Sequence, residues 1–243
     1  MVFPNLRRER FWRNLHFYLG LILSLQLVAW FASGVVMSWF PIEQVRGEHL
    51  QRPAPEVRWT DAMITPADAW QQATAEFRQA QLSFSQRGAE PVYRLQQGDK
   101  QLFISAQSGQ ILQTLSENAV RKMAQQRYQG TGTVQSVELL AQAPAEVRGL
   151  TPPLWQVQFA DNDQSAFYFH PITGQLLRVR TDTWRLYDFF WMLHIMDYED
   201  RSDFNHPLLI ISGGSALGFT LGGFVLLGFR IARGSRHHSN VIG

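Results

Sequence analysis

Two long apolar segments, at residues 15–40 and 207–231, bracket a polar segment and constrain this chain more than any other feature. A helix over the first would be about 39 Å long at 1.5 Å per residue, which is enough to cross the hydrocarbon core of a bilayer. The second, shorter by one residue, also suffices. The sequence therefore predicts two transmembrane helices with an extramembrane region between them.

Basic residues at the outer ends of the two spans predict their orientation, because cytoplasmic flanks carry an excess of arginine and lysine. These residues are Arg7, Arg8, Arg10 and Arg13 before the first span, and Arg230, Arg233 and Arg236 at or after the end of the second. We therefore expect cytoplasmic tails at residues 1–14 and 232–243. The protein would lie in the bacterial inner membrane with both termini cytoplasmic and its central domain periplasmic.

The first span also fits a cleaved signal peptide, because basic residues precede an apolar run and Ala32-Ser33-Gly34 offers small residues for cleavage. Its apolar run is longer than the core of a signal peptide. This length favours an uncleaved anchor.

Composition excludes several classes of site. The chain has no cysteine, which rules out disulfides, thiolate metal sites, iron–sulfur clusters and covalently attached haem. It also lacks a nucleophile elbow, a His-Glu-x-x-His motif, a phosphate loop and a dinucleotide fingerprint. The net charge of +2 reflects mainly the arginines beside the spans, so no nucleic-acid partner is expected.

The polar region contains an internal repeat. Residues 102–112 align without gaps on residues 167–177, an offset of 65 residues, and each copy predicts a strand, a turn and a strand. The shared Ser/Thr-Gly suits the turn because glycine adopts positive φ at little cost. Further strands are expected upstream, at residues 92–96 and 154–159.

A helix precedes each predicted sheet. Thr65 caps the first, with Pro66 at its first position and Asp68 in its first turn, and Ser116 caps the second. The apolar stripes of the two helices are Ala69, Trp70, Ala73 and Phe77 in the first, and Val120, Met123, Ala124 and Tyr128 in the second. Each helix would cover one face of a small antiparallel sheet.

This order of helix, strands and a hairpin with a Ser/Thr-Gly-Gln turn resembles the PepSY domain, present here twice, at about residues 60–115 and 116–180. With Leu15-His16-Phe17-Tyr18-Leu19-Gly20-Leu21 opening the first span, the chain is similar to the PepSY-associated transmembrane family. The resemblance implies an α+β membrane protein in which two transmembrane helices flank a periplasmic tandem of PepSY-like units, over residues 41–183.

The same resemblance implies two kinds of activity. Several members of that family are haem-bearing inner-membrane reductases of ferric iron or ferric siderophores, whereas other PepSY proteins bind or inhibit peptidases. Longer members have four or more spans. With two spans, this chain would need to dimerise to complete an electron path across the membrane.

His16 is the first candidate haem ligand. On a helix it shares a face with Leu19, Gly20 and Leu23, and the glycine would leave room for a flat macrocycle. The alternative is a polar residue at the membrane interface beside its arginines. The family resemblance favours the ligand.

His194 is the second candidate, on a short amphipathic helix predicted at residues 184–198. Its apolar stripe is Trp184, Tyr187, Trp191, His194 and Ile195. Because this helix is too short to span, we expect it to lie in the outer membrane interface. The alternative is a packed histidine bonded to a carbonyl.

The loop before the second span allows two interpretations. In the first, His194 and His206 ligate one outer haem while nearby carboxylates hold hard ferric iron or its chelate. Those carboxylates are Asp197, Glu199 and Asp200. In the second, Asp203 and Asn205 cap the second span, and the other acids are solvated or paired with Arg201.

Gly214, Gly218 and Gly222 form a ladder of small residues at four-residue spacing on the second span. The ladder allows close helix contact, either with the first span or with a second copy of the chain. Alternatively, the same groove could admit the face of a haem. A homodimer would bring four spans together and could place His16 of each chain around an inner haem.

The leading hypothesis is an inner-membrane electron-transfer protein. It would hold haem b noncovalently through His16, His194 and His206, and reduce ferric iron or a ferric chelate in support of iron uptake. The electron donor would be a separate protein, a quinol or a reduced flavin. One rival is a membrane-anchored module without redox activity, whose sheet edges, such as residues 92–96, bind a peptide or protein. Another is a scaffold subunit of a larger redox complex.

Overall fold

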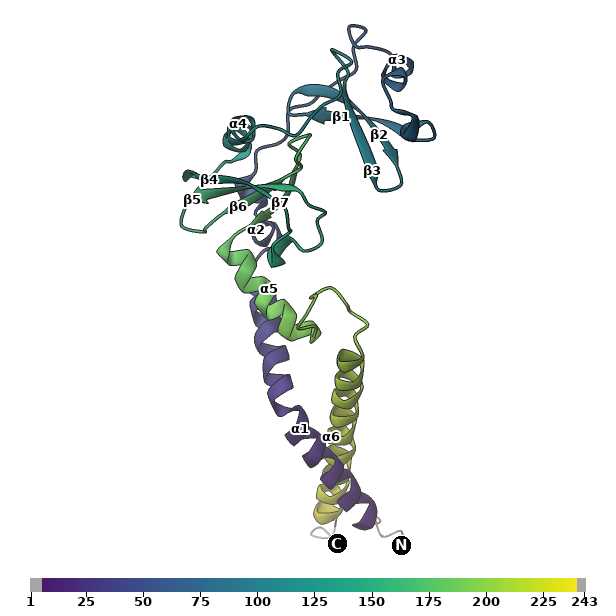
Figure 1. The fold of residues 1–243 in the computed structure, drawn as a ribbon. Helices are drawn as coiled ribbons and strands as arrows, with labels where there is room; N and C mark the ends of the chain where they lie inside the picture. Colours follow the sequence, from purple (N-terminus) through teal and green to yellow (C-terminus); the bar gives the residue numbers. More distant parts are fainter. Residues whose placement is uncertain (1–5, 240–243) are drawn as a thin grey trace. The chain divides into compact units, whose positions relative to one another are not determined.

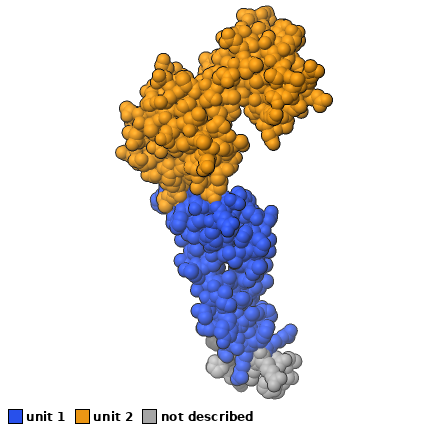
Figure 2. Space-filling model, in the orientation of Figure 1, with its two compact units in different colours: residues 1–40, 187–243 blue, residues 41–186 orange. Residues whose placement is uncertain are grey.

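The computed structural model describes residues 6–239 and divides into two compact units (Figure 2). Residues 1–40 and 187–243 form the helical unit, and residues 41–186 form the sheet unit. The ends of the predicted tails, at residues 1–5 and 240–243, lie outside the described residues, as do the side chains of Arg7, Arg233 and Arg236. Elements of both kinds, helices and antiparallel sheets, confirm the α+β class.

Two long helices dominate the helical unit, α1 (Leu6–Trp39) and α6 (Pro207–Ser239), which lie side by side in Figure 1. They run antiparallel, since Gly20 lies against Phe219, whereas His16, one turn earlier on α1, lies against Gly223, one turn later on α6. Both are long and apolar enough to cross a membrane. α1 begins well before residue 15, because no proline or glycine interrupts its basic first turns.

A third helix, α5 (Asp182–Ile195), joins the two units. It matches the short helix predicted at residues 184–198, except that it ends at Ile195. Met196 follows with φ +56°, a left-handed conformation that stops the helix and turns the chain into the loop before α6.

The first sheet of the sheet unit contains three antiparallel strands in the order β1 (Gln81–Arg87), β2 (Glu90–Gln97) and β3 (Lys100–Ser105). α3 (Pro66–Gln71) and the 3₁₀ turn η2 (Ala75–Phe77) pack on it. The buried residues of this core are Ala69, Phe77, Ala80, Tyr93, Leu95, Ile104 and Ala106. Thr65 caps α3 as predicted, with a reciprocal hydrogen bond to Asp68.

One prediction for this sheet is wrong. Residues 92–96 were expected to offer a sheet edge, but they belong to β2, which pairs with β1 on one side and with β3 on the other. Its backbone groups are therefore already used in two ladders. β1 was not predicted, because its sequence is mostly polar, and its pairing makes β2 central.

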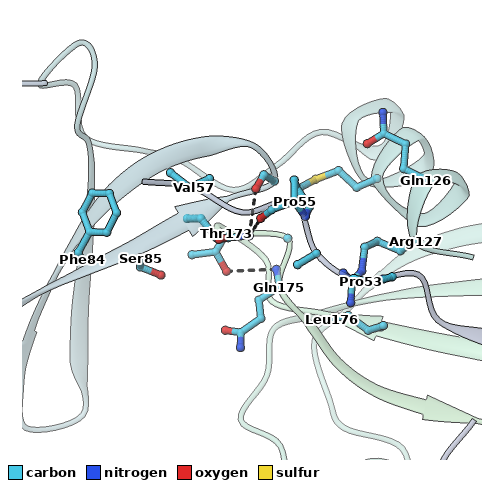
Figure 3. A pocket seen from close by; sticks show the side chains of 15 residues that line it. Pro53, Pro55, Val57, Phe84, Ser85, Gln126, Arg127, Thr173, Gln175 and Leu176 are labelled. Atoms are coloured by element: carbon cyan, nitrogen blue, oxygen red, sulfur yellow. Dashed lines mark hydrogen bonds between the residues drawn. The ribbon is translucent and has the colours of Figure 1, made fainter. Parts of the chain in front are cut away.

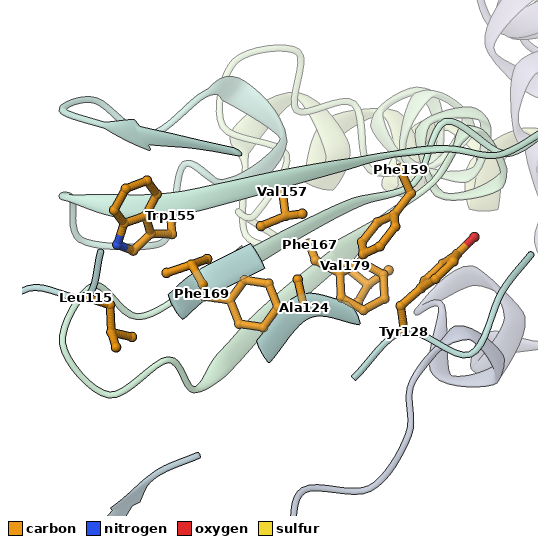
Figure 4. Close-up of a cluster of buried hydrophobic side chains, with 10 residues drawn as sticks. Leu115, Ala124, Tyr128, Trp155, Val157, Phe159, Phe167, Phe169 and Val179 are labelled. Carbon is orange, nitrogen blue, oxygen red and sulfur yellow. The ribbon is translucent and has the colours of Figure 1, made fainter. Parts of the chain in front are cut away.

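The second sheet has the order β4 (Thr133–Leu140), β5 (Leu154–Ala160), β6 (Ala166–Phe169) and β7 (Leu176–Arg180), with α4 (Glu117–Arg127) against it. Ser116 caps α4 as predicted. Figure 4 shows the core between helix and sheet, whose buried members are Leu115, Val120, Ala124, Tyr128, Trp155, Val157, Phe159, Phe167, Phe169 and Val179.

Strand β6 is buried on both faces. Phe167 and Phe169 point into the core under α4, whereas Ala166 and Tyr168 join a second cluster with Val147 of the 3₁₀ turn η3 (Ala145–Val147). Alternate side chains of a strand lie on opposite faces, so one strand contributes to both layers. It is therefore the most deeply enclosed element of the sheet unit.

The internal repeat is visible in the turns that end β3 and β6. Ser105 and His170, equivalent at the 65-residue offset, each accept a hydrogen bond at the side chain from the backbone N–H three residues later, at Ser108 and Thr173. Gly109 and Gly174 close the two turns with φ of +74° and +64°. The second strand is reduced to a single bridge at Ile111 in the first copy, so only the second hairpin forms in full.

A short linker follows α1 and packs on the second repeat. It contains α2 (Ile42–Val45) and the 3₁₀ turn η1 (Glu48–Leu50). Gln51 then forms a bridge with Tyr128 at the end of α4, and Val45 is buried.

Candidate functional site

His16 lies between the two long helices. Its Nδ1 is 2.9 Å from the carbonyl oxygen of Phe219, and its ring stacks on that of Phe219 with centroids 4.1 Å apart. A carbonyl oxygen can only accept, so Nδ1 carries the proton and, in the neutral ring, Nε2 keeps its lone pair. Gly223 gives the ring room, because a Cβ there would come within 3.1 Å of His16 Cε1.

His194 is held in the same way near the other end of α1. Its Nδ1 is 2.9 Å from the hydroxyl of Ser33, a residue with no exposed surface. The Ser33 hydroxyl donates its one proton to the carbonyl of Trp30, at 3.0 Å, so its oxygen accepts the Nδ1 proton of His194. Nε2 of His194 therefore also keeps its lone pair in the neutral ring.

The end of α5 is fixed to α1 by two further hydrogen bonds. Trp30 Nε1 donates to the carbonyl of His194 at 2.8 Å, and Gln26 Nε2 donates to that of Leu193 at 3.3 Å. The last carbonyls of a helix have no partner within it, so these side chains supply the missing donors. The position of His194 is therefore set by its backbone as well as by its ring.

The two imidazoles lie far apart in the helical unit. Ser33 follows His16 by 17 residues on α1, which at 1.5 Å per residue corresponds to about 26 Å along the helix. They are therefore separate positions, and any group bound at one of them would not contact the other.

His206, the third predicted ligand, is oriented differently. Its Nδ1 accepts a hydrogen bond from the backbone N–H of Leu208 at 3.3 Å, and its carbonyl accepts the first helical bond of α6 from Ile210. In the neutral ring the proton then lies on Nε2. His206 therefore caps α6 and its Nε2 is a donor. The prediction that Asp203 and Asn205 cap this helix is wrong, because Asp203 accepts the backbone N–H of Asn205 before the helix begins.

Asp197 organises the loop between α5 and α6. Its two carboxylate oxygens accept hydrogen bonds from four backbone N–H groups, those of Glu199, Asp200, Ser202 and Asp203, at 2.9 to 3.2 Å. The bonds from Asp203 and Ser202 contribute most to lowering the pKa of this carboxyl group to about 2. The carboxylate is thus already surrounded by donors of its own loop.

The loop is also tied to α5. Arg201 pairs with Asp188 on α5, and Trp191 Nε1 donates to the carbonyl of Arg201 at 3.1 Å. The ring of Phe204 packs edge-on against Trp191. Arg201 is thus in an ion pair, as one interpretation predicted, but its partner is Asp188 of α5 and not one of the loop acids that the interpretation named.

The predicted iron ligands do not form a cluster. Glu199 and Asp200 are exposed, whereas Asp197 is buried and points into the loop. Among the described side chains, those of residues 8–232, no three histidine or acidic groups are placed so that they would hold a metal ion. Iron ligation by these three acids stays a prediction without geometric support.

Replacing Asp197 with alanine is expected to open this loop, because four backbone donors lose their acceptor. The low pKa predicts the pH dependence in the native chain: the carboxylate stabilises the folded loop fully above its unfolded pKa, about 4, and this contribution is lost as the pH falls through about 2. Hydrogen exchange of residues 198–203, corrected for intrinsic rates, measures both effects. Asp200→Ala is the matched control, and equal protection in the two variants would contradict this role of Asp197.

The glycine ladder of α6 is used partly within the chain. A Cβ at Gly222 would lie 3.8 Å from both His16 and Trp12, and one at Gly218 would lie 4.0 Å from Leu19. Gly213 and Gly214 have no described atom within 4 Å of that position. Gly218 and Gly222 thus pack on α1, while Gly214 and the adjacent Gly213, near the loop that precedes α6, have no such neighbour.

Sequence reasoning missed the residues that hold His194. Ser33 was considered only as part of a signal-peptide cleavage site, and Gln26 and Trp30 were not singled out. The available signal was their spacing, since 26, 30 and 33 recur at steps of four and three and bring polar side chains to one face of an apolar helix.

Comparisons of the chain with protein-family models, with curated proteins and with solved structures found no match.

Proposed function

We propose that this chain is a membrane-anchored electron-transfer protein that holds haem b noncovalently and reduces ferric iron or a ferric chelate outside the cytoplasmic membrane. The observation that carries the proposal is the shared orientation of His16 and His194. Each ring donates Nδ1–H to an oxygen of another helix and keeps Nε2 for a ligand. Metal-bound histidines are oriented by hydrogen bonds of this kind.

The surface of the two long helices supports the membrane anchor. Large apolar side chains on both are turned outward, for example Leu25, which is 81% exposed, Phe31 and Ile211. Apolar surface on this scale is unfavourable in water and favourable in lipid. The arginines at the outer ends of both helices favour cytoplasmic termini, so that the sheet unit would be periplasmic.

The donor chemistry of the two histidines suits haem iron, since neutral imidazole is the common axial ligand and the chain has no cysteine. Bound haem would supply a one-electron couple, so the protein itself needs no acid or base for the reduction. His16 and His194 would hold it, and Gly222 and Gly223 leave space for the His16 ring.

His16 and His194 lie at two different levels along α1, and each of these levels offers one described histidine whose Nε2 is free. Two axial imidazoles at one level would therefore come from two copies of the chain, or from His194 and a His206 released from its cap. Gly214, at the open end of the glycine ladder, and the adjacent Gly213 would allow close approach of a second copy.

A visible spectrum tests this function. The full chain, expressed with ample haem and purified in mild detergent, is expected to show a Soret band, with α and β bands that sharpen after dithionite. Because the two positions are separate, His16→Ala and His194→Ala should each remove about half of the haem, and the double variant nearly all of it.

His49→Ala is the matched control, since His49 is an exposed histidine of the sheet unit. Its haem content should equal that of the native chain. A colourless native protein, or unchanged haem content in the double variant, would overturn the proposal.

A second candidate function is binding of a ligand by the sheet unit, with the two long helices as its anchor. A pocket between the two repeats favours it. This function needs no haem and predicts a colourless protein.

A further inference from the structure

The sheet unit contains a pocket of about 510 Å³ where its two repeats meet (Figure 3). Pro53 and Pro55 of the linker, Phe84 and Ser85 of β1, and Arg127 of α4 are among its walls. The turn at residues 173–176 of the second repeat completes it. This volume is within the range of sites that hold small organic molecules.

Arg127 is the only charged residue among the fifteen described residues that line the pocket. Its Nη1 is buried and has no hydrogen-bond partner among the described residues. Burial lowers the pKa of the Arg127 guanidinium, and no nearby carboxylate opposes this effect. Arg127 as a whole is only partly buried, but a buried nitrogen of a charged group without a hydrogen-bond partner is unusual and requires an explanation.

The rest of the wall is suited to an apolar body. Phe84, Met123 and Leu176 present apolar side chains, together with the two prolines. Neutral polar groups are available from Ser85, Gln126 and Gln175. The pocket therefore combines one unpaired cation with an apolar interior and offers no acidic group that would repel an anion.

We propose that this junction pocket binds an apolar carboxylate, a free organic acid or the carboxyl end of a peptide, through an ion pair with Arg127. The proposal deepens the second candidate function and rests on it, and it is independent of haem. A guanidinium can donate hydrogen bonds to a carboxylate, and the ion pair neutralises a charge that has no acidic partner in the pocket wall.

The first test compares an acid with its amide on the full native chain in detergent, by isothermal titration calorimetry. Acetyl-Leu-Phe with a free carboxyl group is expected to bind about 10 to 100 times more tightly than acetyl-Leu-Phe amide, since a charge-assisted hydrogen bond is lost in the amide. Equal affinities, or no binding of the acid, would overturn the proposal.

The variant Arg127→Gln tests the residue. Arg127→Gln should bind the acid no more tightly than the native chain binds the amide. The control is Arg121→Gln on the same helix, whose side chain pairs with Glu117 and does not line the pocket. This control should bind the acid like the native chain. Without ligand, the melting temperature of Arg127→Gln should be about equal to that of the native chain, because a partly buried charge with an unpartnered nitrogen is replaced by a neutral side chain. Undiminished binding by Arg127→Gln would overturn the proposal, and the comparison of acid and amide does not depend on any variant.

A third probe, 4-phenylbutyrate, distinguishes the two sources of the carboxylate. Affinity equal to that of acetyl-Leu-Phe indicates a free organic acid, whereas much weaker binding indicates the end of a peptide, and both support the site. Failure of this inference is distinguishable from failure of the haem proposal. Calorimetry reports on the junction pocket alone, and the visible spectrum reports on His16 and His194.

Discussion

Truncation of Phe167 to alanine is expected to lower the free energy of unfolding of the sheet unit by about 3–5 kcal/mol. Phe167 has no exposed surface and lies on β6, which is covered on both faces. Its ring packs on those of Tyr128, Phe159 and Phe169, with centroids 5.0 to 6.3 Å away. A cavity there would be enclosed by large rings from β5, from β6 and from Tyr128, which follows α4, and this restricts its collapse.

Phe84→Ala is the matched control, since Phe84 is 42% exposed on the edge strand β1 and its loss should cost about 1 kcal/mol or less. Hydrogen exchange of the slowest amides of β5 and β6, in the full chain in detergent, measures both values. Similar losses in the two variants would mean that the cluster around Phe167 does not limit the stability of the second repeat.

Local signals in the sequence predicted the helices of the sheet unit well. Thr65 and Ser116 were identified as caps, and the stripes that follow them are the residues that pack on each sheet. Capping and helical periodicity depend on residues three or four apart, so they can be recognised without knowledge of the fold. The first helix is shorter than expected, because Thr74 adopts an extended conformation and the chain continues as a 3₁₀ turn.

The order of the strands in each sheet was harder to predict from the sequence than the helices were. β2 was expected at a sheet edge, and only its pairing with β1, a mostly polar strand, makes it central. β4 was also missed, although its sequence of valine, threonine and leucine is typical of a strand. The position of a strand in a sheet is set by partners elsewhere in the chain, which its own residues do not reveal.

In the candidate site, too, the sequence predicted individual residues but not their distant partners. The sequence pointed to His16 and His194, but their hydrogen-bond partners are 203 and 161 residues away. Asp197 was grouped with Glu199 and Asp200 as a metal ligand because all three are acidic. The structure separates them, since backbone N–H groups surround only Asp197, and backbone donors leave no trace in side-chain composition.

The second large effect concerns Ser33, which holds the ring of His194. If His194 ligates haem as proposed, Ser33→Ala is expected to weaken haem retention there by about 10 to 100 times, the usual cost of removing a hydrogen bond that orients a metal-bound histidine. Without the hydroxyl, Nδ1–H has no acceptor at this position and the ring is free to rotate. Transfer of haem to excess apomyoglobin measures the rate of loss.

Ser24→Ala is the matched control on the same helix, because Ser24 also donates to the carbonyl three residues earlier but is exposed and contacts no histidine. It should lose haem as slowly as the native chain. Equal rates in the two variants would mean that Ser33 does not orient His194 as a ligand. The proposed role of His16 would be unaffected by that result, because its ring is held by the carbonyl of Phe219 on α6.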